Sequence, residues 1–191
     1  MKGKIVLVAL ILAAISLACG TISPSPSSQD NIPPAATLTV ASPVPTEEDL
    51  FGKASQFAGS WEGDWNNTTY GSTGDIAVVI TVQQDGTASL EIIAGGNVFG
   101  TSGVPIVTCP GFYDADGLHF LGARLPVFGD LKILIDYSGN TEMSASLLPY
   151  ATIATVSSEG SVLGNQITVG YKVTFTGGGQ ANGTASMTRS P

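Results

Sequence analysis

Residues 167–175 read ITVGYKVTF and carry the clearest structural pattern in this sequence. Every second residue is apolar, and a polar residue or a glycine stands between each pair. Successive side chains of a β-strand point to opposite faces, so this alternation predicts a strand with one buried side and one solvent-facing side. The buried series would be Ile167, Val169, Tyr171, Val173 and Phe175.

The same two-residue period recurs from residue 50 onward, between turns rich in glycine. Asp85-Gly86 and residues 138–140 have the composition of tight hairpin turns. No stretch after residue 50 sustains a helical apolar period, so we predict an all-β domain over residues 50–191 with eight to ten antiparallel strands. Further strands are predicted at residues 76–82, at Leu90 and Ile92, at residues 131–137, at Met143, Ala145 and Leu147, and at residues 183–189.

Composition narrows the classes of function. The 191 residues include 24 glycines and only 12% charged residues, which suits a turn-rich β domain better than a helical one. Seven Lys and Arg against 15 Asp and Glu give a net charge of −8, without a basic cluster, so a nucleic-acid partner is excluded. One histidine and two cysteines exclude a site with several histidines and a four-cysteine zinc site. We therefore predict no metal and no cofactor.

The first and last predicted strands carry residues that resemble a feature of lipocalins and related calycins. Gly59-Ser60-Trp61 is similar to the Gly-x-Trp element on the first strand of those proteins. There, an arginine of the last strand packs over the indole near the closed end of the barrel, and Arg189 stands in the inward phase of Met187. The resemblance implies a mostly up-and-down β-barrel with Trp61 and Arg189 as a structural pair. A β-sandwich is the alternative, since it also accommodates such strands.

The resemblance also implies a function, the binding of a small hydrophobic ligand inside the barrel. The alternative is a filled barrel that serves as a structural or interaction module of the cell envelope, with a protein partner that the sequence does not identify. Large side chains can fill a small barrel, so the sequence leaves both open. The large residues of the predicted inner face are Ile76, Ile80, Ile133, Tyr137, Ile167, Tyr171 and Phe175.

The sequence favours a protein that is not an enzyme. It contains no Gly-x-Ser-x-Gly nucleophile motif. His119 stands in opposite phase to two apolar neighbours, which predicts a solvated strand face, and Cys109 is expected to be buried as a small apolar residue rather than paired with His119 as a nucleophile. Residues 114–117 read DADG, and we expect a hairpin turn there instead of a calcium loop, because Leu125 stands where the loop's glutamate is needed.

The N-terminus resembles that of bacterial lipoproteins. Lys2 and Lys4 precede a 14-residue apolar run, residues 5–18, which suits a signal peptide and is shorter than the roughly 20 residues of a transmembrane helix. Residues 16–19 read SLAC, similar to a lipobox, although leucine is more usual at the position of Ser16. The resemblance implies that residues 1–18 are removed and that Cys19 carries the acyl chains, palmitate among them.

Residues 19–49 are expected to form the lipidated cysteine and a disordered linker. Six of the 11 prolines lie there, and no apolar period is visible. Without Lys2 and Lys4, the mature chain has 5 basic and 15 acidic residues, a net charge of −10. We therefore expect a lipid-anchored protein whose partner is the membrane, on the cell membrane or the outer membrane, with its domain outside the cytoplasm and held away from anionic headgroups.

Overall fold

The computed structural model describes residues 45–102 and 104–191. These residues belong to one compact unit, Ser42–Pro191. The predicted signal peptide, Cys19 and the linker up to residue 44 lie outside the described residues. Within the described part of the chain, no helix combines the length and the apolar character needed to cross a membrane.

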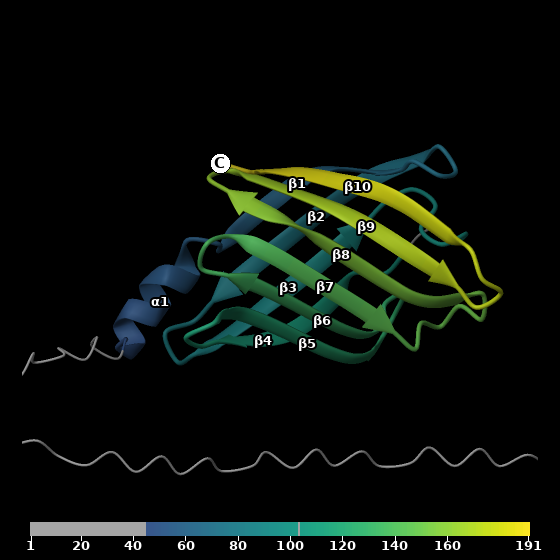
Figure 1. The fold of residues 1–191 in the computed structure, drawn as a ribbon. Coiled ribbons are helices and arrows are strands. Elements are labelled where there is room, and N and C mark those ends of the chain that lie inside the picture. The colour runs from purple at the N-terminus through teal and green to yellow at the C-terminus, as the bar shows by residue number, and fades with distance from the viewer. Residues whose placement is uncertain (1–44, 103) are drawn as a thin grey trace, which may run out of the picture. The chain divides into compact units, whose positions relative to one another are not determined.

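In the described residues, ten antiparallel strands form one closed β-barrel (Figure 1). Each strand pairs with its neighbours in sequence, and β1 and β10 pair with each other to close the barrel. This confirms the up-and-down barrel and excludes the sandwich. The strands are β1 (Gly59–Asn67), β2 (Ser72–Val82), β3 (Thr87–Ala94), β4 (Val107–Tyr113), β5 (Gly117–Leu125), β6 (Gly129–Asp136), β7 (Asn140–Ser146), β8 (Ile153–Leu163), β9 (Gln166–Phe175) and β10 (Gln180–Arg189).

A short helix, α1 (Glu47–Ser55), precedes the barrel and corrects the predicted domain start. We expected a disordered linker through residue 49 and a domain from residue 50, but the helix begins at Glu47. The backbone N–H of Asp49 donates to the Thr46 hydroxyl, and the Asp49 carboxylate accepts from the Thr46 backbone, which forms a capping box. Three acidic residues in the first turn also suit the positive end of the helix dipole.

The barrel has two distinct ends. α1 packs against β2 and β4, and its residues Leu50 and Phe51 contact the hydrophobic core. We call this the closed end (Figure 1). Because the strands alternate in direction, the loops after β1, β3, β5, β7 and β9 gather at the opposite end, which we call the open end.

One predicted strand ends earlier than expected. Met143 and Ala145 face the interior from β7, but Leu147 does not continue this series. The strand ends at Ser146, and Leu147 has a φ of 51° and is 76% exposed. The left-handed backbone turns the chain away, so its side chain leaves the inner face at the open end.

Candidate functional site

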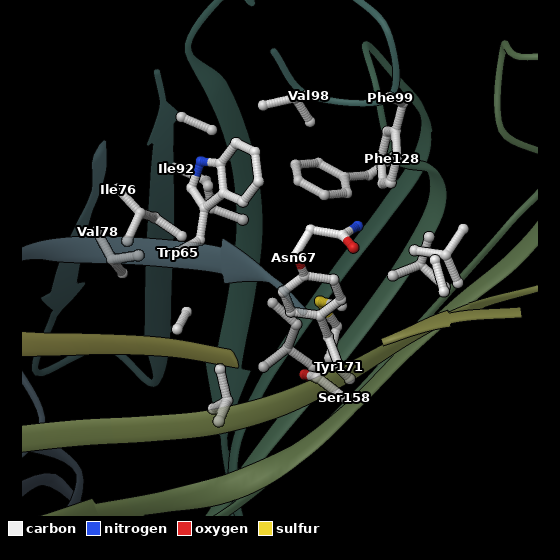
Figure 2. Close-up of a pocket in the computed structure, with 18 of the residues that line it drawn as sticks. Trp65, Asn67, Ile76, Val78, Ile92, Val98, Phe99, Phe128, Ser158 and Tyr171 are labelled. Carbon is white, nitrogen blue, oxygen red and sulfur yellow. The ribbon is translucent and has the colours of Figure 1, made fainter. Parts of the chain in front are cut away.

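The barrel encloses a cavity of about 570 Å³ (Figure 2). Ile80, Leu90 and Ile135 line its deep part, toward the closed end. Six of the seven large residues predicted to face inward line this cavity. The exception, Tyr137, lies beside α1 with the Lys53 Nζ 5.5 Å from its ring centroid. The inward side chains were therefore placed correctly, and they surround a space instead of filling it.

Aromatic side chains frame the open end of the cavity. The ring centroids of Phe99 and Phe128 are 6.5 Å apart, and those of Phe99 and Tyr150 are 5.6 Å apart. The rings of Tyr70 and Phe175 also meet edge to face, with their centroids 6.4 Å apart. Tyr70 lines the cavity and is itself 66% exposed, so the cavity reaches the surface here. These rings provide an apolar entrance.

Trp65 forms part of the cavity wall, and a glycine makes room for it. The indole N–H of Trp65 donates to the Gly95 carbonyl at 3.0 Å, which satisfies its polar atom and leaves the ring face as apolar surface. An added Cβ on Gly74 would lie 2.7 Å from the Nε1 atom of Trp65. Only glycine at position 74 allows this placement of the indole.

A row of polar residues crosses the mainly apolar wall. Ser158 on β8 is paired with Tyr171 on β9, Tyr171 with Gly183 on β10, and Gly183 with Asn67 on β1. The Tyr171 ring lies directly over Gly183, where an added Cβ would be 2.2 Å from Cζ. Ser158, Tyr171 and Asn67 all line the cavity (Figure 2). We call these three residues the polar row.

The hydrogen bonds of Asn67 determine which of its side-chain groups can interact with a ligand in the cavity. Its Oδ1 atom accepts from the backbone N–H groups of Thr69 at 3.0 Å and Tyr70 at 2.9 Å. The carbonyl side of the amide is therefore engaged in the turn, and the NH₂ side, which carries two N–H groups, is directed in part at Tyr171. Burial raises the pKa of Tyr171, and its hydrogen bond with the Asn67 side chain offsets part of the rise. The Tyr171 hydroxyl therefore stays neutral at physiological pH.

The cavity lining is nearly free of charge. Among the described residues that line it there is no Lys, Arg or His, and Glu142 is the single carboxylate residue. Glu142 is exposed and stands out of phase with its inward neighbours Thr141 and Met143. The Thr141 hydroxyl is buried and has no hydrogen-bond partner within the described structure.

Trp61 and Arg189 lie at the closed end, outside the cavity lining. The guanidinium carbon of Arg189 is 4.4 Å from the Trp61 ring centroid, and the two residues are direct partners in the β1–β10 register. Trp61 is fully buried and donates through Nε1 to the Phe57 carbonyl at 3.3 Å. Arg189 donates through Nη2 to the carbonyl of Gln56, which follows α1. The contact expected from the sequence is present, and Arg189 also links the barrel to the C-terminal end of α1.

Cys109 and His119 lie on opposite faces of the barrel wall. Cys109 is completely buried, as predicted, and burial raises the pKa of its thiol. The His119 ring stacks on Phe112 on the outer face, with the centroids 4.7 Å apart, and its Nε2 is 3.0 Å from Oδ1 of Asp114. The two side chains therefore do not form a nucleophile and base pair.

Three solved structures are similar to this chain to different degrees. Rv2717c from M. tuberculosis matches with a TM-score of 0.54 and 12% identity, over 72% of this chain and 94% of that protein. The S-type phycobiliprotein lyase CPES from Guillardia theta has a TM-score of 0.44 and 10% identity, with 75% and 92% covered. A redesigned β-barrel has a TM-score of 0.34 and 13% identity, with 73% and 96% covered.

The likeness to Rv2717c, at 12% identity, shows a shared β-barrel fold. No protein-family model and no curated protein matches the sequence. Fold and site together thus define a class, a closed antiparallel β-barrel with an apolar cavity that reaches the surface at one end.

Proposed function

We propose that this barrel binds a small hydrophobic molecule in its cavity. The observation that carries the proposal is the apolar interior space of about 570 Å³. Binding sites for small molecules usually enclose roughly 300–1,000 Å³ and are lined mainly by hydrophobic and aromatic side chains. Each Å² of apolar ligand surface removed from water contributes about 25 cal/mol, so such a cavity favours apolar molecules.

The alternative of a filled structural barrel has less support. Its premise was that large inner side chains occupy the interior, and six of them instead line an open space. The proposed role is that of a carrier or sensor without a chemical step. This role is compatible with a lining in which, among the described residues, no Lys, His or Cys occurs.

We also propose that the barrel is held at a membrane by acyl chains on Cys19, on the cell membrane or the outer membrane and outside the cytoplasm. The support is the lipobox-like sequence SLAC at residues 16–19. Two or more acyl chains on one residue would give a stable anchor, since each buried CH₂ contributes about 0.8 kcal/mol.

A fluorescent probe tests the binding site. N-phenyl-1-naphthylamine is neutral and apolar and fluoresces more strongly in an apolar site, and it would be titrated into the exported chain carrying Cys19→Ser, which leaves no site for competing acyl chains. Ala185 faces the cavity, and its neighbour Ser186 faces solvent on the same strand. Ala185→Phe should weaken probe binding at least about tenfold by occupying the cavity, whereas Ser186→Phe should not.

A second cavity-filling variant keeps the test valid if Ala185→Phe disrupts the fold. Ala94→Phe introduces the same ring from β3, near the open end. Thermal unfolding of each variant would show that the barrel is intact. Equal probe affinity of the wild type, both cavity variants and Ser186→Phe would show that the probe binds elsewhere and would contradict the proposed function.

A further inference from the structure

We infer that the cavity selects neutral ligands, with a hydroxyl or carbonyl group on an apolar body, over fatty-acid anions. The inference rests on the proposed function, because it specifies the ligand of the same cavity. It comes from two features of the lining: the polar row on a mainly apolar wall and the lack of a basic side chain among the described lining residues.

The polar row provides both donors and acceptors without charge. The Asn67 NH₂ group donates, while the hydroxyls of Ser158 and Tyr171 donate or accept. Strand register keeps the three residues together, since Ser158 pairs with Tyr171, and Tyr171 lies over the glycine that pairs with Asn67. A hydroxyl or carbonyl group at this position would find complementary partners.

The polar row also sets the ligand's orientation. Asn67 is the last residue of β1, next to the open end, whereas the deep part of the cavity is lined by aliphatic residues such as Ile80 and Leu90. Ser158 and Tyr171 lie midway along β8 and β9, so a ligand places its apolar end toward the closed end and its polar group between the middle of the barrel and the entrance. Burial of the apolar part supplies the affinity, and the polar row supplies the selectivity.

Every basic side chain of the described residues lies outside this lining. Lys53 and Arg189 are held at the closed end by Tyr137 and Trp61. The other three are exposed, namely Arg124, Lys132 and Lys172. His119 is on the outer face beside Asp114. No cation is therefore placed to compensate a buried ligand carboxylate.

An anionic headgroup would lose its hydration without gaining a counter-charge. Desolvation of an unpaired carboxylate costs much more than desolvation of a hydroxyl that finds a hydrogen-bond partner. The net charge of −8 adds a further unfavourable field. A fatty alcohol and the matching fatty-acid anion fill the same apolar space, so their difference in affinity reports on the headgroup alone.

Competition against bound N-phenyl-1-naphthylamine at pH 8 tests this selectivity, again with the full exported chain carrying Cys19→Ser. The competitors are decan-1-ol, methyl decanoate and decanoate, which differ in the headgroup. We expect the alcohol and the ester to displace the probe at concentrations at least about tenfold lower than decanoate, a difference of about 1.4 kcal/mol.

Variants of the polar row test whether its side chains contribute to binding of the alcohol. Tyr171→Phe and Ser158→Ala should each weaken decan-1-ol about three- to tenfold, once each competition is corrected for the probe affinity measured separately for that variant. Ser157→Ala is the matched control, because Ser157 is the solvent-facing neighbour of Ser158 on β8. Decanoate binding as well as decan-1-ol would overturn the inference, and so would alcohol affinity that neither row variant changes. A probe that does not bind the wild type would instead refute the proposed function itself.

Discussion

Arg189 covers the indole of Trp61 from the neighbouring, hydrogen-bonded strand, with the guanidinium carbon 4.4 Å from the ring centroid. The two residues come from the first and last strands, which meet because the barrel closes. The same guanidinium donates to the Gln56 carbonyl, so one side chain joins the barrel seam to the end of α1. The pair lies at the end remote from the open end of the cavity, which indicates a structural role.

Loss of this contact should destabilise the barrel. Arg189→Ala is expected to lower the free energy of unfolding by about 1–3 kcal/mol, because it removes the packing on Trp61 and leaves the Gln56 carbonyl without its partner. In a double-mutant cycle with Trp61→Phe, a coupling energy of about 0.5–2 kcal/mol is expected from urea unfolding. Lys172→Ala, an exposed basic position on β9, is the control. Simple additivity of the two changes would contradict the pairing.

Two glycines on adjacent strands should differ in how strongly an added methyl group destabilises the barrel. At Gly183, the new Cβ would lie 2.2 Å from Cζ of Tyr171 and 2.3 Å from the Asn66 carbonyl oxygen. At Gly170, the nearest atom is the Glu159 carbonyl oxygen at 4.0 Å. Gly183→Ala should cost about 1–3 kcal/mol and shift Tyr171, whereas Gly170→Ala should stay within about 0.5 kcal/mol.

Urea unfolding and the decan-1-ol competition would measure both effects. Only Gly183→Ala should weaken the alcohol, since it displaces the central residue of the polar row. Equal stability and equal alcohol affinity in the two variants would show that Tyr171 does not depend on the glycine.

Asp136 should contribute stability that disappears in acid. The Asn140 side-chain amide donates to its carboxylate at 2.7 Å, and the backbone N–H groups of Ser138 and Asn140 donate at 2.8 and 2.9 Å. These bonds, the Asn140 side chain first, lower the pKa of Asp136 in the folded protein. A lowered folded-state pKa means that the contribution is complete above the unfolded value of about 3.9 and is lost as pH falls through the folded value.

The measurement is urea unfolding at pH 7 and at pH 3. Asp136→Ala should be less stable than wild type at pH 7, and the difference should shrink at pH 3. Asp64→Ala is the comparison, because Asp64 is an exposed residue of β1 that lies within a strand instead of a turn. A deficit of Asp136→Ala that is the same at both pH values would show that its carboxylate is not the cause.

Acylation of Cys19 is a prediction from the sequence alone, because Cys19 lies outside the described residues. Intact-mass analysis of the membrane fraction should show a chain that begins at Cys19 and carries the mass of its acyl chains. Cys19→Ser should abolish that added mass and release the protein from the membrane. A wild-type mass that differs from the variant by the substitution alone would show that no lipid is attached.

The strands could be predicted from sequence because alternation is a local property. The series from Ile167 to Phe175 marks the inner face of β9 without reference to any other part of the chain. The helix α1 was missed although Thr46 and Asp49 have capping-box spacing, because residues 47–49 were assigned to the proline-rich linker and no helical apolar period is visible after residue 50. The barrel itself was predictable only through the resemblance of Trp61 and Arg189 to the calycin pair.

The cavity and the polar row required the tertiary structure. Interior volume depends on how many strands close the barrel and on their stagger, and neither quantity is a property of one strand. Asn67, Ser158 and Tyr171 come together only through the register of β8, β9, β10 and β1. The sequence by itself thus determined which side of each strand is apolar, because that follows from a two-residue period. Which side chains share a wall, and whether they leave a space between them, was decided by strand pairing over long sequence separations.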